Sequence, residues 1–288
     1  MNPLVSTAWL ADRLHDPHVR AVDASWYLPA AGRDAVAEFR EGHIPGAVRF
    51  DLDQASDPAS PLPHMLPSPE RFAGLMSGLG LGDDDTIVAY DASGVNLSAP
   101  RAWWMFRVFG HPRVAVLDGG LGAWRREGRP LEPGDPAPRP PGRFTARLDG
   151  TLVRDAPAVL EILRAGGAQL VDARSAGRFA GTEPEPRPGL RGGHIPGSRS
   201  VPFQSLVDGS GRMLEPEALR RLIRAAGVDP ARPVVTSCGS GVTACAVALA
   251  LEVAGTPEPV AVYDGSWTEW GGRDDLPVEA GPPRPAGP

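Results

Sequence analysis

The chain has 288 residues, of which 42% are hydrophobic and 22% charged, and its formal net charge is −6. These totals describe a globular protein that is long enough for two domains. The acidic balance argues against nucleic-acid binding, which needs a basic surface. No apolar run is long enough to span a bilayer, and the first residues do not pair a basic segment with an apolar one. We therefore expect neither a membrane span nor a signal peptide.

Cysteine and histidine usage gives no sign of disulfides or metal sites. The two cysteines, Cys238 and Cys245, are close in sequence and do not make a disulfide framework, which favours a reducing, cytoplasmic setting. The six histidines include no H-x-x-x-H pair, and there is no C-x-x-C motif. We expect no metal and no cofactor.

In the first half of the chain, short β-rich runs alternate with helical patterns. The runs at 20–23, 87–90 and 114–117 are typical of strands, and helices are expected at 70–79 and 99–109. The segment that follows, 132–147, is rich in proline, which resists both helix and central strand. We interpret it as a semi-rigid linker.

The second half repeats this alternation. Strands are expected at 170–172, 234–236 and 260–263, and helices at 243–254 and at 217–226, with Pro216 as a start signal. Alternation of this kind predicts α/β domains, each with a mainly parallel central sheet flanked by helices. The last residues, 281–288, are Gly- and Pro-rich, and we expect a disordered tail.

Several motifs of the first half recur in the second half in the same order. They are V-D-A-S at 22–25 and V-D-A-R at 171–174, G-H-I-P-G at 42–46 and 193–197, the runs 87–96 and 234–243, and D-G-G at 118–120 with Trp124 against D-G-S at 264–266 with Trp270. Such a series indicates a tandem duplication. The domains are then expected at 1–131 and 148–280, on either side of the linker.

The loop C-G-S-G-V-T at 238–243 stands between an expected strand and an expected helix. Backbone N–H groups and the positive end of a helix dipole both favour a thiolate over a thiol at this position. The thiolate is the nucleophilic form of cysteine. Ligands of parallel sheets bind beyond the carboxyl ends of the strands, and Cys238 falls at such an end.

The first copy carries Asp91 where the second has Cys238. An aspartate cannot replace a thiolate nucleophile in sulfur chemistry. We therefore predict that the second copy is catalytic and the first inactive.

Together these motifs resemble the two-domain rhodaneses, a family of sulfurtransferases. The resemblance covers nearly the whole chain outside the tail and is closest to the members that use 3-mercaptopyruvate. It rests on the loop at 238–243 with Ala244, on G-R-F at 177–179, on G-T-E-P-E-P-R at 181–187, on both H-I-P-G turns, and on the first-copy segments 50–53, 64–67 and 98–106.

The resemblance implies a sulfurtransferase that moves sulfane sulfur from 3-mercaptopyruvate through a Cys238 persulfide, releasing pyruvate. The acceptor would be cyanide or a thiol, such as thioredoxin or a small thiol. By the same resemblance, Ser240, His64 and Asp53 handle protons, and Arg178 and Arg187 bind the substrate. The other loop residues are expected to line the substrate site: Gly239, Gly241, Val242 and Thr243. Because Asp53 and His64 belong to the first copy, the site would be completed between the copies.

Three alternative functions share parts of this pattern. A thiosulfate sulfurtransferase (rhodanese) is the alternative within the same chemistry, but relatives specialised for thiosulfate typically carry basic residues where this chain has Gly239 and Ser240. A phosphatase of this fold needs an arginine at position 244, which is alanine. A non-enzymatic sulfur carrier would use the same thiolate and stays open.

Three kinds of residue that could suggest function are better explained by structural roles. His43 and His194 occur in both copies, including the inactive one, which indicates a role in stabilising the turn. Cys245 falls among apolar residues and is expected in the core. Trp103 and Trp104 are expected to pack along a helix.

Overall fold

A computed structural model of the chain describes residues 1–136 and 138–282 and divides them into two compact units. The first unit contains Met1–Pro58, Leu66–Asp149 and Val207–Met213, and the second contains Ala59–Met65, Gly150–Leu206 and the chain from Leu214 onward. Each unit therefore includes one short segment from the other side of the proline-rich stretch. Position 137 of the expected linker and 283–288 of the expected tail lie outside the described residues.

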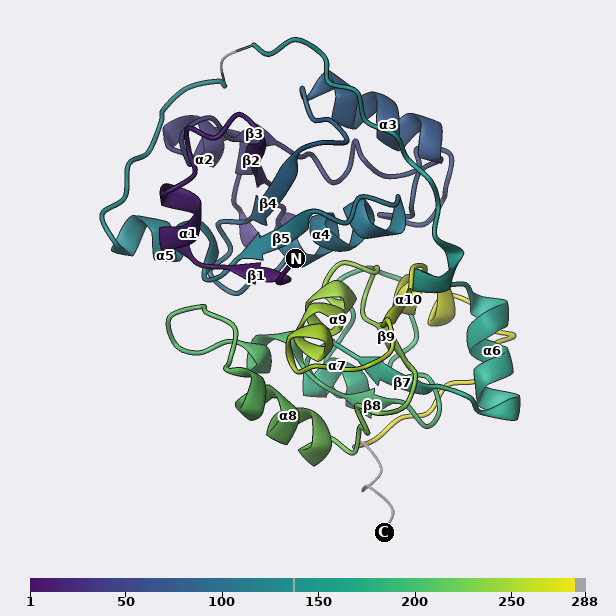
Figure 1. The fold of residues 1–288 in the computed structure, drawn as a ribbon. Helices are drawn as coiled ribbons and strands as arrows, with labels where there is room; N and C mark the ends of the chain where they lie inside the picture. Colours follow the sequence, from purple (N-terminus) through teal and green to yellow (C-terminus); the bar gives the residue numbers. More distant parts are fainter. Residues whose placement is uncertain (137, 283–288) are drawn as a thin grey trace. The chain divides into compact units, whose positions relative to one another are not determined.

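The first unit is built on a five-stranded sheet of order β1-β5-β4-β2-β3, parallel at every pairing (Figure 1). Its strands are β1 (Leu4–Val5), β2 (Val19–Asp23), β3 (Val48–Arg49), β4 (Thr86–Tyr90) and β5 (Val114–Leu117). Its helices are α1 (Thr7–Ala11), α2 (Ala35–Glu41), α3 (Pro69–Gly78), α4 (Ala99–Val108), α5 (Gly120–Arg126) and the 3₁₀ turn η1 (Pro29–Ala31).

The second unit repeats this topology, with strand order β6-β10-β9-β7-β8 and parallel pairing. Its strands are β6 (Val153–Arg154), β7 (Gln169–Asp172), β8 (Arg199–Ser200), β9 (Val234–Ser237) and β10 (Ala261–Tyr263). Its helices are α6 (Ala156–Ala165), α7 (Ala176–Ala180), α8 (Pro216–Ala225), α9 (Ala244–Val253), α10 (Ser266–Trp270) and the 3₁₀ turns η2 (Gly150–Leu152) and η3 (Phe203–Leu206).

Local sequence explains where several helices begin. The Ser68 hydroxyl caps α3, and Pro69 occupies its first turn, where a missing N–H has no cost. Asp155 caps α6 in the same way by accepting a hydrogen bond from the N–H of Ala158. α8 likewise starts with Pro216 in its first turn.

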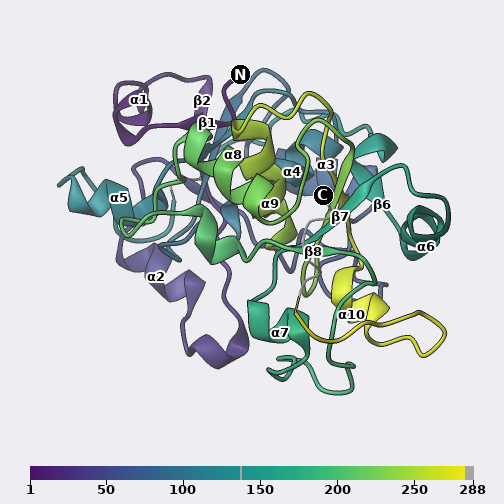
Figure 2. The same ribbon diagram turned by 90° about the horizontal axis from the view of Figure 1, so that it is seen from below.

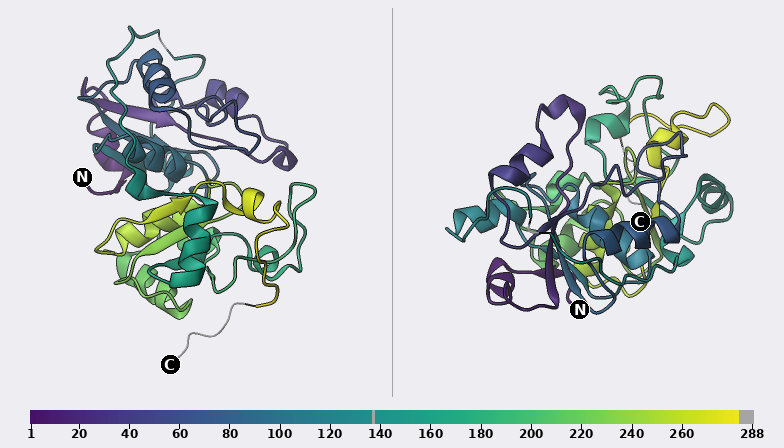
Figure 3. Two further views of the ribbon diagram at one scale, coloured as in Figure 1. Left: turned by 90° about the vertical axis from the view of Figure 1, so that its right-hand side faces the viewer. Right: turned by 90° about the horizontal axis from the view of Figure 1, so that it is seen from above.

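Helices cover both faces of each sheet, so each core has two halves. In the second unit α6 and α10 pack with one face through Val159, Trp267 and Trp270. The teal helix α6 stands in front of that sheet in Figure 3 (left). α9 lies against β9 and β10 on the other face, with α8 beside it (Figure 2). Since α9 has apolar side chains all around, it is buried almost completely.

The expected alternation and parallel sheets are confirmed. The six expected strands are all present, and the four expected helices differ from the observed ones by one residue at their ends. The edge strands β1, β3, β6 and β8 were not predicted, because two residues show no periodicity. Helices α1, α2, α5, α6, α7 and α10 were also missed. Among residues 1–136 and 138–282, no helix has the length and apolarity needed to cross a membrane.

Candidate active site

Cys238 follows the central strand β9 and precedes α9, at the carboxyl edge of the second sheet. Its side chain is almost fully buried, with 1% of its surface exposed. Gly241 in the same loop has φ of +75°, a conformation that glycine adopts without strain. The strand–glycine loop–helix arrangement predicted from the sequence is therefore present.

The backbone of the active loop, residues 238–243, is anchored on the start of α10. The N–H of Cys238 donates to Ser266 Oγ at 3.1 Å, and its carbonyl accepts from the N–H of Trp267 at 3.0 Å. The Gly239 carbonyl accepts two hydrogen bonds from Thr268, from N–H at 2.8 Å and from Oγ1 at 2.6 Å. These contacts fix the peptide groups on both sides of Cys238.

The structure brings together two of the residues expected to handle protons. His64 Nδ1 lies 2.9 Å from Ser240 Oγ, and both side chains are buried. His64 has φ of +62°, which is uncommon and strained for a residue other than glycine. Although His64 precedes the linker, its segment Ala59–Met65 belongs to the second compact unit.

Asp53 lies in the first compact unit. Both of its carboxylate oxygens accept from the indole N–H of Trp26 at 3.2 Å, and its own N–H donates to the Asp51 carboxylate at 3.0 Å. Its role beside the His64 imidazole stays a prediction.

Arg178, on α7, is held next to the active loop by a carboxylate. Its Nε and Nη2 donate to the two oxygens of Glu185 at 3.2 and 2.6 Å. A β-carbon placed on Gly239 would lie 2.9 Å from Arg178 Nη2, so the guanidinium group sits directly against the loop. The Arg178 position therefore suits a ligand bound beside Cys238.

A buried ion network behind Arg178 was not predicted. Glu185 also accepts from Arg174 Nη1 at 2.7 Å, and Arg174 in turn pairs with Asp172 at 2.6 Å. The Arg174 guanidinium is fully buried and lies over the Trp267 ring at 4.2 Å. Burial lowers the pKa of Arg174, but the Asp172 and Glu185 carboxylates outweigh it and raise the pKa above its usual value. The sequence signal was Arg174 itself, which stands where the first copy has Ser25.

The remaining predicted ligands lie in loops. Arg187 is half-buried in the segment between α7 and β8, and its contact with substrate stays a prediction. Val242 and Thr243 lead into α9, since their carbonyls accept from the N–H groups of Cys245 and Ala246 at 3.2 and 3.1 Å. Cys245 is fully buried, as expected, and its thiol donates to the Gly241 carbonyl at 3.2 Å.

In the corresponding loop of the first copy, groups of the loop donate hydrogen bonds to the carboxylate of Asp91. One Asp91 oxygen accepts from the N–H and hydroxyl of Ser93 at 2.9 and 2.5 Å. The other accepts from the N–H groups of Ser98 and Ala99, each at 2.9 Å. Asp91 is 1% exposed and so serves as a buried cap at the start of α4. This geometry supports the interpretation that the first copy is inactive.

Both histidines of the H-I-P-G turns have structural surroundings. Each is buried, stacks on a phenylalanine and places Nδ1 within hydrogen-bond distance of that phenylalanine's carbonyl oxygen: His43 with Phe39 at 2.9 Å and His194 with Phe179 at 2.8 Å. They play the same part in both copies. Trp103 and Trp104 are buried on α4.

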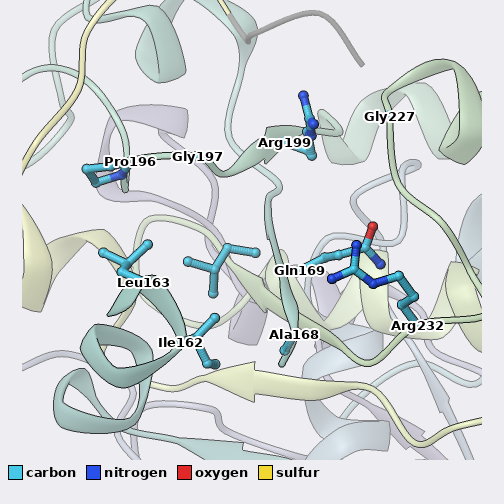
Figure 4. Close-up of a pocket in the computed structure, with 10 residues that line it drawn as sticks. Ile162, Leu163, Ala168, Gln169, Pro196, Gly197, Arg199, Gly227 and Arg232 are labelled. Carbon is cyan, nitrogen blue, oxygen red and sulfur yellow. The ribbon is translucent and has the colours of Figure 1, made fainter. Parts of the chain in front are cut away.

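Neither a metal cluster nor the pocket beside α6 competes with the Cys238 loop. In the part of the chain that the structure describes, no group of His, Cys, Asp or Glu side chains could hold a metal ion. A pocket of about 330 Å³ has Ile162 and Leu163 on one side and Gln169 and Arg232 on the other (Figure 4). Gln169 begins β7 and Arg232 precedes β9, so this pocket lies at the amino edge of the sheet, opposite Cys238.

Comparisons with known proteins agree with the geometry. Residues 6–127 and 155–273 match the family described as Rhodanese-like domain. The chain is 49% identical to 3-mercaptopyruvate sulfurtransferase of Homo sapiens, over 93% of this chain and 91% of that protein. It is 45% identical to thiosulfate sulfurtransferase of Cricetulus griseus, again over 93% of this chain and 91% of that protein.

A solved structure is also similar along almost the whole chain. It is that of SseA from Escherichia coli, a 3-mercaptopyruvate sulfotransferase with the rhodanese fold. The two share 42% identity and a TM-score of 0.84, and the match covers 93% of this chain and 99% of SseA.

Proposed function

This chain belongs to the two-domain rhodanese family of sulfurtransferases, and we propose that it moves sulfane sulfur from 3-mercaptopyruvate to a thiol or cyanide through a persulfide on Cys238. The observation that carries the proposal is the nucleophile itself. Cys238 stands at the carboxyl end of a central parallel strand, in a glycine loop held on its backbone. In the equivalent loop of the first copy, Asp91 replaces the cysteine, and its carboxylate accepts hydrogen bonds from the backbone.

In the first step the Cys238 thiolate attacks the sulfur of 3-mercaptopyruvate. The new S–S bond forms as the carbon–sulfur bond breaks, and that bond's electron pair passes to the carbon and gives the enolate of pyruvate. The proton of the donor thiol ends on this carbon, so the products are pyruvate and an ionised Cys238 persulfide. Ser240 and His64 are suited to move the proton, because their polar atoms lie 2.9 Å apart in a buried setting.

In the second step an acceptor removes the outer sulfur. A thiolate or cyanide attacks that sulfur, the S–S bond breaks, and the electron pair returns to Cys238 as the thiolate. The two steps share one covalent intermediate, so ping-pong kinetics are expected. Thioredoxin or a small thiol as acceptor, and a cytoplasmic setting, are part of this proposal.

Arginine guanidinium groups bind the carboxylate of the sulfur donor in this proposal. A planar guanidinium fork matches a carboxylate and also stabilises a nearby thiolate. Arg178 lies beside the loop, and we assign Arg187 to the same ligand from the family resemblance. Asp53 would orient His64, by the general logic of a carboxylate–imidazole–hydroxyl triad.

Thiosulfate is the alternative donor, since a relative with 45% identity carries that name. Thiosulfate is a compact dianion, and an added cation beside the nucleophile favours its binding. The loop of this chain offers Gly239 and Ser240 instead. Arg178 also occupies the space into which a side chain at position 239 would grow. These features favour 3-mercaptopyruvate.

The experiment compares the two donors on the wild-type protein and on Cys238→Ser. With 3-mercaptopyruvate we expect a mass gain of about 32 Da, one sulfur, on Cys238. We also expect many equivalents of pyruvate and a higher kcat/KM than with thiosulfate. Cys238→Ser should show neither loading nor turnover, whereas the control Cys245→Ser should keep both.

Each contrary outcome removes one part of the proposal. A protein that fails to load Cys238 is not a sulfurtransferase of this mechanism. Loading with a single equivalent of pyruvate identifies a sulfur carrier. A higher kcat/KM with thiosulfate reverses the choice of donor.

A further inference from the structure

Ser266, the first residue of α10, joins the nucleophile's loop to the neighbouring strand through one hydroxyl group. Its Oγ accepts from the N–H of Cys238 at 3.1 Å and donates to the carbonyl of Tyr263, the last residue of β10, at 2.7 Å. Ser266 is fully buried. The hydroxyl therefore satisfies two polar backbone groups and ties the start of the active loop to the sheet.

Thr268 holds the next peptide group. Its hydroxyl donates to the Gly239 carbonyl at 2.6 Å, in addition to its own backbone N–H at 2.8 Å. Two of the four residues from Cys238 to Gly241 are glycines, which have the least conformational restraint of any residue. A loop of this composition needs contacts with other parts of the chain to keep it in one conformation.

The first copy provides an internal comparison. The residues that correspond to Ser266 and Thr268 are Gly120 and Gly122, which have no hydroxyl. The backbone bond is retained, because the N–H of Leu121 donates to the Asp91 carbonyl at 3.0 Å, as Trp267 does to Cys238. The two hydroxyl contacts thus accompany the cysteine and are missing where the aspartate stands.

The backbone conformation at Ser266 is unfavourable for any residue that has a side chain. Ser266 has φ of +49°, in the left-handed region that disfavours side chains, and Gly120 has a similar φ of +53°. Glycine would fit Ser266's conformation without strain. The first copy could not accept a serine as it stands, because a β-carbon on Gly120 would lie 2.5 Å from the Asp91 carbonyl oxygen. A strained serine next to a nucleophile indicates function rather than folding.

We propose that the hydroxyls of Ser266 and Thr268 form a clamp on the Cys238–Gly239 backbone and act as positioning residues for sulfur transfer. The proposal rests on the proposed function, since the clamp places the thiolate for attack on the donor's sulfur. A displacement of about 1 Å at a reacting atom can lower a rate about a hundredfold. The clamp acts on the attack, not on the binding of the donor's carboxylate.

The test uses Ser266→Ala, Ser266→Gly and Thr268→Val in the full chain. Each variant should lower kcat about tenfold and change KM for 3-mercaptopyruvate less than about twofold. Ser266→Gly keeps the test open should Ser266→Ala fail to fold, because glycine relieves the left-handed strain. Thr268→Val keeps the shape and the backbone N–H and removes only the hydroxyl.

Amide hydrogen exchange of the loop supplies a readout that does not depend on sulfur chemistry. The clamp predicts faster exchange across 238–243 in all three variants and no change in β7. Thr256→Val is the matched control, since it removes a hydroxyl that donates to the Leu251 carbonyl at the far end of α9. It should leave kcat and the loop's exchange unchanged.

The outcomes separate the clamp from the proposed function. Unchanged kcat and unchanged loop exchange in the Ser266 and Thr268 variants would overturn the clamp. An equal loss of kcat in Thr256→Val would also overturn it, because general destabilisation would then be the cause. If the wild type has no turnover while the variants exchange faster in the loop, the proposed function fails and the contact itself is confirmed.

Discussion

Glu185 stands between two arginines and determines where one of them lies. Its carboxylate is almost fully buried and accepts from Arg174 on one side and Arg178 on the other. Arg174 is fixed by Asp172 at the end of β7, so the chain of charges runs from the sheet to the guanidinium beside the active loop. Arg178 is thus oriented before any ligand arrives, and preorganisation of this kind lowers the cost of binding.

We predict that Glu185→Gln raises KM for 3-mercaptopyruvate about tenfold and lowers kcat less. A glutamine places an NH₂ group against one of the two arginines, so Arg178 loses its fixed orientation. Steady-state kinetics at a temperature where both proteins are folded measure the effect. Glu183→Gln removes a charge from the same segment, where it bonds to the Ser175 hydroxyl, and should leave KM unchanged. A KM that is equally unaffected in both variants would contradict this role for Glu185.

At the scale of elements, equivalent helices begin in different ways in the two copies. The first amides of α4 are bound by the Asp91 carboxylate, whereas the N–H groups of Cys245 and Ala246 bond to loop carbonyls. The first copy therefore uses the position equivalent to Cys238 to cap a helix. A cysteine there would lack both clamp hydroxyls, because the corresponding residues are Gly120 and Gly122.

We accordingly expect Asp91→Cys, placed in a Cys238→Ser background, to remain unloaded by 3-mercaptopyruvate. The variant should also lose about 1 kcal/mol of stability, because an uncharged thiol replaces the cap of α4. Mass spectrometry and urea unfolding check the two parts, with Cys238→Ser alone as the reference. A gain of one sulfur on position 91 would show that the loop needs only a thiol.

The sequence predicted the long elements and missed the short ones for a physical reason. Strands β4 and β5 are buried and almost entirely apolar, and their composition alone identifies them. The edge strands and α10 are too short for a period to appear. α10 nevertheless carries Ser266 and Thr268, so contacts that hold the Cys238 and Gly239 backbone come from an element that pattern analysis could not find.

At the scale of the molecule, the compact units do not follow the order of the chain. The segment Ala59–Met65 comes before the proline-rich stretch and belongs to the second unit, which contains Cys238. It contributes His64, which contacts Ser240. The family resemblance named both residues, but only the folded chain shows them together. The contacts of Ser266 and Thr268 with the Cys238 loop likewise join residues far apart in sequence, which explains why local patterns did not reveal them.

His64→Asn tests what this segment contributes. Asparagine tolerates the left-handed conformation that His64 adopts, so stability should change little. We expect kcat to fall about a hundredfold, because an amide cannot carry a proton to or from Ser240. Turnover and the urea midpoint are measured together, with the exposed His15→Asn as control. Full activity in His64→Asn would remove the histidine from the reaction.

The four hydrogen bonds of the Asp91 carboxylate bear on the history of the duplication. Once a buried carboxylate had become the cap of α4, restoring a thiol at that position would first weaken the helix. It would also need hydroxyls at Gly120 and Gly122, and the first of these sites has no room for a β-carbon. We therefore expect that no single substitution gives the first copy a reactive thiol. Descendants of this gene should keep one reactive centre even under selection for faster sulfur transfer.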